Sequence, residues 1–236
     1  MIIGQIGIGL ALRTLSKSTN LGWIIASTLL LDMLLWIFIL FGIENYVIPE
    51  NYEQVHHFNY DFPFSHGILA ALCWMLLVYF VVRIYTLRQK RAVLLSMGVF
   101  FSILIDIITH PAEIPFLFPN SFKIGLGLSN YIYVDFIFEV LILLSGLYLY
   151  YKTSYSKTFL GRYGLGIFMV VLMYVDFGQR YLSPDPDDYI DTALGSLTSL
   201  VVIIAITYWL DKQRSHNGPI FKSHQSGSSV SKTTEN

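Results

Sequence analysis

Six long apolar runs, separated by short polar segments, dominate the pattern of hydrophobic and polar positions along the chain. They cover residues 21–43, 64–82, 92–109, 131–151, 163–177 and 190–210. Each run is close to the roughly 20 residues that an α-helix needs to cross a bilayer. A transmembrane β-barrel would instead show short segments of alternating hydrophobicity. The pattern therefore predicts an all-α fold, a polytopic transmembrane helical bundle of about six spans.

A further apolar segment, residues 1–12, is too short to cross a membrane. A signal peptide would need a basic residue before its apolar segment, and none precedes this one. We expect a short helix that is buried against the bundle on the cytoplasmic side or dips part-way into the membrane.

The C-terminal segment, residues 211–236, is rich in Ser, Lys and Gln and has no apolar periodicity. Such a composition cannot bury enough apolar surface to fold. We expect a transmembrane bundle over residues 1–210 and a disordered cytoplasmic tail over residues 211–236.

Composition excludes a soluble globular domain, because 54% of the 236 residues are hydrophobic, 13% are charged and the mean hydropathy is +0.57. The surroundings of the protein are therefore a lipid bilayer. The net charge of −1 and the position of the basic residues at the ends of apolar runs give no indication of nucleic-acid binding. The single cysteine, Cys73, excludes an internal disulfide.

Basic and acidic segments alternate between the apolar runs. The basic segments hold Arg13 and Lys17, then Arg83, Arg88, Lys90 and Arg91, then Lys152, Lys157 and Arg162, and finally Lys212, Arg214 and Lys222. The acidic segments hold Glu44, Glu50, Glu53 and Asp61, and later Asp185, Asp187 and Asp188. Since cytoplasmic loops carry the excess of Lys and Arg, we expect a multi-pass protein of the inner (plasma) membrane with both termini in the cytoplasm.

One carboxylate lies near the middle of the first apolar run, at Asp32. A central Asp costs about 2.5–3.5 kcal/mol on insertion scales, so it should face the interior of the bundle. The intramembrane position indicates a functional residue, and the alternative is a hydrogen-bonded Asp that fixes helix packing.

Two histidines and a second carboxylate are expected at the outer boundary of the membrane. His66 opens the second run, whereas Asp106 and His110 close the third. Asp106 and His110 are four residues apart and share a helical face, and Pro111 should end the helix at His110. Neutral His and Asp are usual ligands of a zinc-like ion. Spacing alone also fits a hydrogen-bonded pair of Asp and His.

The fourth run carries Asp135 and Glu139 on one helical face. Glu139 lies more than two turns inside the outer boundary and should point into the bundle. Asp135 lies nearer the surface, where its charge favours the N-terminus of the helix.

Five motifs occur in a fixed order: IGIGLALR, LLLDMLLWIFILFGIE, DFPFSHGILAAL, LIDIITHPAEIPFLFP, and KIGLGLSN with a following FE. Over about residues 4–150 the chain resembles the uncharacterised bacterial integral-membrane proteins grouped with membrane-bound metal-dependent hydrolases. The resemblance implies a divalent metal ion, zinc or manganese, at His66, Asp106 and His110. It also implies Glu139 or Asp32 as the general base for a metal-bound water, and a lipid or lipid-linked substrate.

Three positions depart from the pattern of that family. Gln5 and Ser102 stand where histidine is common, and Glu113 stands where aspartate is common. The depleted set of imidazoles points to a divergent or inactive member of the family.

Two other classes of function remain open from the sequence. Asp32, Asp106 and Glu139 would also serve as the protonatable sites of a permease or proton-coupled transporter. Alternatively, the polar residues hold the helices together in a non-catalytic structural membrane protein.

Overall fold

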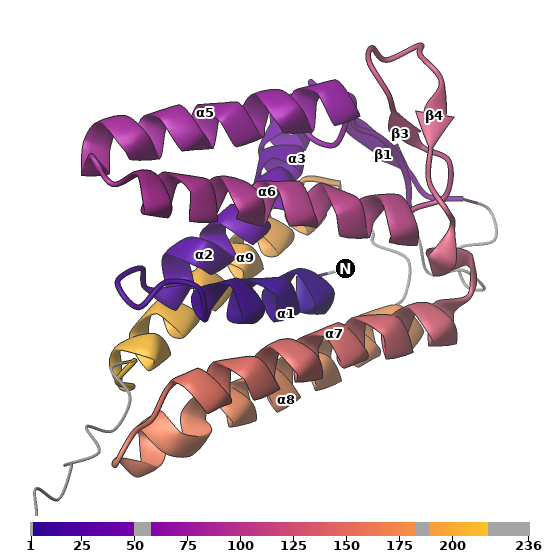
Figure 1. Cartoon of the computed structure of the whole chain (residues 1–236). Coiled ribbons are helices and arrows are strands. Elements are labelled where there is room, and N and C mark those ends of the chain that lie inside the picture. Colours follow the sequence, from indigo (N-terminus) through magenta and orange to yellow (C-terminus); the bar gives the residue numbers. More distant parts are fainter. Residues whose placement is uncertain (1, 50–57, 183–188, 217–236) are drawn as a thin grey trace, which may run out of the picture.

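The computed structural model describes residues 2–49, 58–182 and 189–216 of the chain. These residues form eight α-helices, one short 3-10 helix and two small two-stranded sheets (Figure 1). The expectations for Glu50, Glu53, Asp185, Asp187, Asp188 and residues 217–236 lie outside the described residues.

Five helices are long and apolar enough to cross a membrane. They are α5 (Ile68–Thr86), α6 (Gln89–Thr109), α7 (Ile132–Thr153), α8 (Phe159–Tyr181) and α9 (Tyr189–Lys212). Helices α2 (Leu21–Thr28) and α3 (Leu30–Leu40) form a sixth span if they are taken together. The prediction of an all-α bundle of about six spans is confirmed.

The first span is bent by 55° between α2 and α3. The hydroxyls of Ser27 and Thr28 donate to the carbonyls of Ile24 and Ile25, three residues back. Such bonds compete with the helical ladder and bend helices. Asp32 therefore lies in the first turn of a new helix, α3, rather than in the middle of a continuous one.

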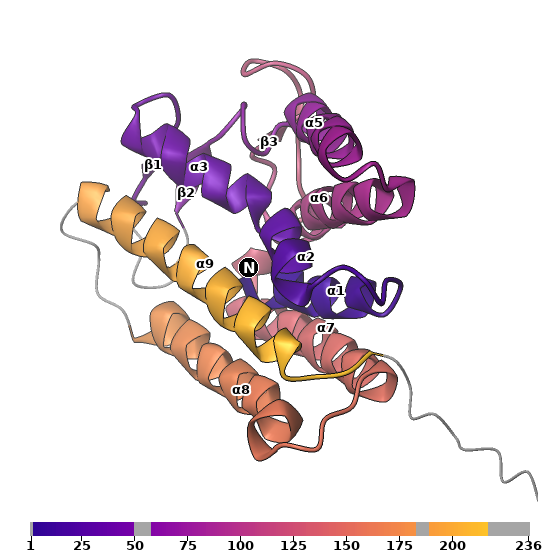
Figure 2. The same ribbon diagram turned by 90° about the vertical axis from the view of Figure 1, so that its left-hand side faces the viewer.

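Helix α1 (Ile2–Arg13) lies inside the bundle, against α2, α6 and α7 (Figure 2). Its 12 residues rise by about 18 Å, well short of the roughly 30 Å hydrocarbon core. The expected short, buried N-terminal helix is confirmed. Gly7 and Gly146 permit its close contact with α7, because a Cβ added to Gly146 would overlap the carbonyl oxygen of Gly7.

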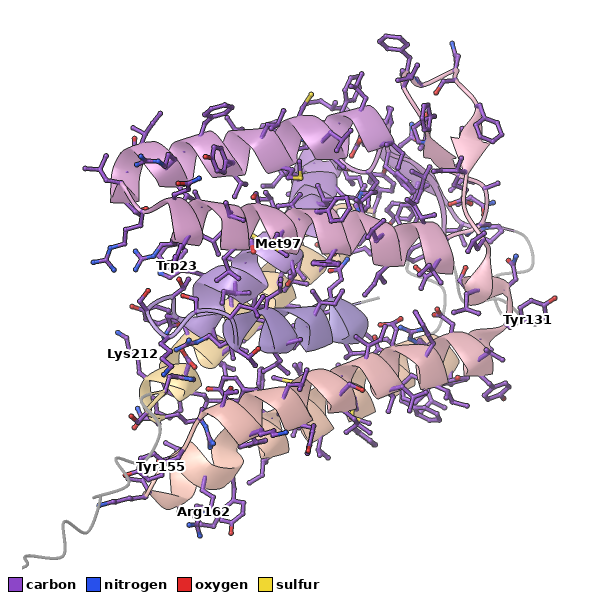
Figure 3. All side chains as sticks on the ribbon, viewed as in Figure 1. Trp23, Met97, Tyr131, Tyr155, Arg162 and Lys212 are labelled. Atoms are coloured by element: carbon purple, nitrogen blue, oxygen red, sulfur yellow. The ribbon has the colours of Figure 1, made fainter. Side chains whose placement is uncertain are left out.

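Four basic segments meet at one end of the bundle. Arg91 Nη2 donates to the Ser18 carbonyl at 3.2 Å, and Arg13 Nε lies 3.2 Å from Asp211 Oδ2. Tyr155 and Ser215 form a β-bridge between the α7–α8 connection and the segment after α9. Figure 3 shows Arg162 and Lys212 at this end and Tyr131 at the opposite one. The alternation of charge along the sequence therefore corresponds to two ends of the folded bundle.

The opposite end carries the two sheets. Strand β1 (Asn45–Val47) pairs with β2 (Asn59–Asp61), and β3 (Ile114–Pro115) pairs with β4 (Lys123–Ile124), both antiparallel. The 3-10 helix η1 (Leu128–Asn130) then leads into α7. Gly127, at φ +71°, takes the left-handed conformation that favours glycine. These connections join the ends of α3, α5, α6 and α7.

Helix α6 ends and helix α5 begins close to the expected site. Helix α6 stops at Thr109, with His110 extended before Pro111, as predicted. Helix α5 begins at Ile68, later than the apolar run, because the residues from Pro63 to Gly67 form a turn. His66 therefore lies in a turn that enters the bundle, and its side chain is not tied to a helical face.

The segment from Asp211 to His216, which the sequence assigns to the tail, contacts the bundle. Asp211 is buried in the last turn of α9, and Arg214 Nε donates to Ser154 Oγ at 2.9 Å. These contacts extend the packed part of the chain beyond residue 210.

Candidate functional site

Three of the predicted site residues come together between α3, the turn before α5, and α6. Nε2 of His66 lies 3.7 Å from Oδ1 of Asp32 and 3.6 Å from Oδ2 of Asp106. We call these three residues the Asp–His–Asp cluster. Its members come from three separate segments of the sequence, and the fold of the bundle brings them together.

The Asp–His–Asp cluster is largely withdrawn from solvent. The side chain of Asp106 is 0% exposed, that of His66 is 2% exposed and that of Asp32 is 19% exposed. In such surroundings the attraction between an imidazolium and a carboxylate at 3.6–3.7 Å is several times stronger than in water. Two carboxylates facing one imidazole therefore favour a bound proton on this group of residues.

The orientation of His66 follows from its neighbour and from Glu44. The Ser65 hydroxyl lies 2.9 Å from Nδ1 of His66, so Nε2 is the ring atom that faces both acids. Oε1 of Glu44 accepts hydrogen bonds from the backbone N–H groups of Phe64 (2.7 Å) and Ser65 (2.8 Å). These bonds fix the turn that carries the imidazole.

Glu44 is itself buried in the loop after α3. Burial raises the pKa of the Glu44 carboxyl above its usual value, and the hydrogen bonds from Ser65 and Phe64 oppose this effect only in part. Protonation of Glu44 is therefore linked to the turn that holds His66.

Helix α1 completes one side of the cluster. Nε2 of Gln5 donates to Oδ1 of Asp106 at 3.3 Å. Buried oxygens without a hydrogen-bond partner remain at Gln5 Oε1, Asp32 Oδ2, Asp106 Oδ2 and Ser102 Oγ. Because nearly all buried polar atoms are hydrogen-bonded in folded proteins, this concentration of unused acceptors indicates a site that binds a proton, water or a polar ligand.

His110 lies beside the cluster but faces another group. Its ring centroid is 6.3 Å from that of His66, and the ring of Phe62 packs against both imidazoles. Nδ1 of His110 lies 3.9 Å from Oε2 of Glu113, which also accepts from the Tyr60 N–H at 3.4 Å. His110 thus lies against Phe62 and near Glu113, beside the Asp–His–Asp cluster.

Among residues 2–49, 58–182 and 189–216, no group of three or more His, Cys, Asp or Glu side chains is arranged to hold a metal ion. Gln5 and Ser102 stand where the resemblance expects imidazoles, and both contribute neutral oxygens instead. The described residues therefore add no support to a metal ion at His66, Asp106 and His110.

Glu139 belongs to a second charged group, which we call the Arg180 cluster (Asp135, Glu139, Asp176 and Arg180). Arg180 donates to Asp176 at 2.6 Å, to Asp135 at 2.5 Å and also to Glu139. The other oxygen of Glu139 accepts from the N–H of Gly4 at 3.1 Å. Pairing with a buried arginine gives Glu139 a structural contact that links α7 to α8.

The sequence interpretation missed Arg180. Two signals could have found it: it is a cation at the acidic end of the bundle, against the charge pattern, and it follows Asp176 by one helical turn. Gly4 and Gln5 of α1 contact the Arg180 cluster and the Asp–His–Asp cluster respectively. The start of α1 thus lies between the two groups.

Comparisons of the chain with protein-family models, with curated proteins and with solved structures gave no match.

Proposed function

We propose that this protein is a proton-coupled carrier of the plasma membrane, with the Asp–His–Asp cluster as its proton site. The observation that carries the proposal is that Nε2 of His66 faces the carboxylates of both Asp32 and Asp106, buried near the outer end of the apolar bundle. Buried Asp and His groups of this kind form proton relays in membrane pumps and transporters.

The break in the first span supports the same function. Broken helices form the binding sites of many secondary transporters. Asp32 begins the half-helix α3, next to a bend of 55°, and its partner His66 lies on a different element. A change of charge at the cluster would therefore act directly on the orientation of α3.

Electrostatics gives the direction of this coupling. A proton held by the cluster reduces the repulsion between Asp32 and Asp106, and attraction to the imidazole then holds α3 and α6 together. Loss of the proton leaves two carboxylates with like charge in a poorly polarisable interior, where repulsion is strong. Deprotonation thus separates α3 from α6. The negative charge favours a cationic solute over an anionic one.

Metal-dependent hydrolysis of a lipid or lipid-linked substrate remains the hypothesis that the resemblance implies. It requires a ligand group around His66 and His110, and the arrangement of the described residues gives it no support. A purely structural role for the polar residues would leave the unused oxygens of the cluster without an explanation.

The orientation of the carrier follows from its charges. The basic end holds Arg13, Lys152 and Lys212, so the positive-inside rule assigns it to the cytoplasm. Cysteines introduced at Lys157 and at Asp61 of a Cys73→Ser variant test this assignment. A membrane-impermeant thiol reagent added to intact cells should label the cysteine at 61 and not the one at 157, and the reverse pattern would contradict it.

Proteoliposomes that contain a pH-sensitive dye test the transport function. We expect that a cationic solute from a panel of small cations and neutral molecules drives proton movement in the wild type. Asp106→Asn and His66→Gln should abolish it, whereas Asp61→Asn, which alters an exposed carboxylate, should retain it. The proposal fails if no solute moves protons in the wild type, or if Asp106→Asn transports as fast.

A further inference from the structure

A cavity lined in part by lysines opens at the basic end of the bundle, far from the Asp–His–Asp cluster in the fold. Its volume is about 250 Å³. The lining combines two lysines with hydroxyl and imidazole groups from three separate segments: Lys17, Lys152, Thr153, Ser154, Ser215 and His216. The hydroxyls of Thr153 and Ser154 already donate to backbone carbonyls, so the ammonium groups of the two lysines are the donors that suit the oxygens of a phosphate group.

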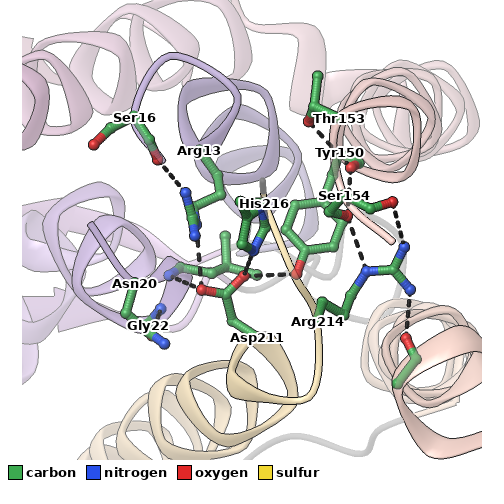
Figure 4. A network of polar contacts seen from close by, with 12 residues as sticks. Arg13, Ser16, Asn20, Gly22, Tyr150, Thr153, Ser154, Asp211, Arg214 and His216 are labelled. Atoms are coloured by element: carbon green, nitrogen blue, oxygen red, sulfur yellow. Dashed lines mark hydrogen bonds and ion pairs between the residues drawn. The ribbon is translucent and has the colours of Figure 1, made fainter. Parts of the chain in front are cut away.

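The carboxylate nearest to the cavity does not cancel the charge of its lysines. Asp211 is buried and already accepts from Arg13, Tyr150 and the N–H of Leu21, and contacts His216 (Figure 4). Arg214 lies close by and is held by the Ser154 hydroxyl and carbonyl, each at 2.9 Å. The cavity is therefore a concentrated region of positive charge, which attracts anions.

An apolar groove of about 360 Å³ runs between α1 and α7. Gly7 and Gly146 form its narrowest part, where the two backbones touch. On α7 its wall includes Leu141 and Leu149, which are 58% and 41% exposed and so face the hydrocarbon of the bilayer. An acyl chain fits these surroundings.

The groove and the cavity adjoin on α7. Leu149 of the groove and Thr153 of the cavity are four residues apart, so they lie one turn from each other on the helix. Residues 141–153 span about 18 Å of α7, so this stretch runs from the polar end of the helix well into the apolar layer.

We propose that this stretch of α7 binds one anionic phospholipid, with its phosphate in the cavity at Lys17 and Lys152 and an acyl chain in the groove beside Leu141 and Leu149. The charge of the cavity selects an anionic headgroup, as basic pockets between transmembrane helices do. The apolar groove next to the cavity selects a lipid over a free anion. Neither feature belongs to the proposed proton site.

Thermal unfolding of the detergent-purified full chain, followed by circular dichroism, tests the proposal. The protein is titrated with phosphatidylglycerol, phosphatidylcholine or inorganic phosphate, since a ligand that binds the folded state raises the melting temperature. We expect phosphatidylglycerol alone to raise it. Lys17→Ser combined with Lys152→Ser should weaken apparent phosphatidylglycerol binding about 30-fold, because each juxtamembrane lysine strengthens binding about fivefold.

Two matched controls separate a defined site from general attraction. Lys90→Ser combined with Lys157→Ser removes two exposed lysines outside the cavity and should leave binding unchanged. Ser145→Phe should weaken lipid binding by filling the groove, whereas Leu144→Phe, on an adjacent exposed face, should not. Equal stabilisation by phosphatidylcholine or by inorganic phosphate overturns the proposal, as does an equal loss in the lysine control.

Discussion

Nη1 of Arg180, near the end of α8, lies 2.5 Å from Oδ2 of Asp135, near the start of α7. The two side chains are 13% and 3% exposed, and Glu139 at 0% shares the same guanidinium. The N–H of Gly4 joins the group through Glu139. This ion pair therefore connects α7, α8 and α1 inside the bundle, where removal of one partner leaves uncompensated charge.

Loss of Arg180 should strongly destabilise the protein. We expect Arg180→Met to lower the free energy of unfolding by about 3–5 kcal/mol, the usual cost of breaking a buried ion pair. Arg180→Lys should lose less, because the charge remains while the fork of donors is lost. Denaturant unfolding in detergent measures the effect. Arg162→Met, at an exposed arginine of the same helix, is the control, and wild-type stability of Arg180→Met would contradict the prediction.

Energetic coupling between His66 and Asp106 should be measurable. A double-mutant cycle of His66→Gln and Asp106→Asn is measured on the free energy of unfolding. We expect a coupling free energy of about 1 kcal/mol or more, because the two side chains interact directly. His66→Gln combined with Asp61→Asn should be additive, since Asp61 is exposed in β2. Additivity in the first cycle would show that the Asp–His–Asp cluster does not act as a unit.

Glu44 should make stability fall as the pH rises. Its pKa is raised by burial, so the folded state keeps the Glu44 proton at pH values where the unfolded state has lost it. Stability from this group is then fully present below the ordinary glutamate pKa of about 4.3 and is lost as the pH rises through the folded-state value.

The Glu44→Gln variant isolates this effect, because the amide oxygen can still accept from Phe64 and Ser65. We expect the wild type to lose stability relative to Glu44→Gln as the pH rises above the ordinary glutamate pKa of about 4.3. Melting temperatures of both proteins at pH values below and above this pKa test the sign. A difference that is constant with pH, or one that favours the wild type more at high pH, contradicts the prediction.

The contact between α1 and α7 should tolerate no side chain at Gly146. Gly146→Ala places a methyl group against the carbonyl of Gly7, and we expect a loss of about 1–3 kcal/mol from overpacking. Gly178→Ala is the matched control, because nothing lies within 4 Å of its added Cβ. That substitution should stabilise α8 by up to about 1 kcal/mol. Similar melting temperatures for both variants would refute the tight contact.

The metal content of the purified protein distinguishes a metal-dependent hydrolase from a proton-coupled carrier. With a proton site at His66, we expect the melting temperature to be insensitive to a divalent-ion chelator and to added zinc or manganese. Elemental analysis of the purified protein provides the direct measurement. Stoichiometric zinc or manganese that disappears in the His66→Gln variant would instead support the metal-dependent hydrolase.

Several features near the site were predictable because their causes are local. Pro111 ends α6 through the restriction it places on His110, and the apolar residues before Arg13 form a short buried helix. Other features were not predictable. The bend before Asp32 depends on hydroxyl bonds that Ser27 and Thr28 form in only some helices. The contact of His110 with Glu113 rather than with Asp106 depends on the direction of the chain after Pro111.

The sequence by itself determined the all-α bundle, the approximate spans and the two ends of opposite charge, because each follows from hydrophobic length or from charge within a few residues. Only the tertiary structure decided which buried groups meet. It placed His66 next to Asp32 and Asp106, and it paired Glu139 with Arg180. Contacts between helices depend on rotation, bending and the depth of each helix, and a one-residue turn of a helix moves a side chain by 100°. Hydrophobic runs fix the length of a span but not these three quantities.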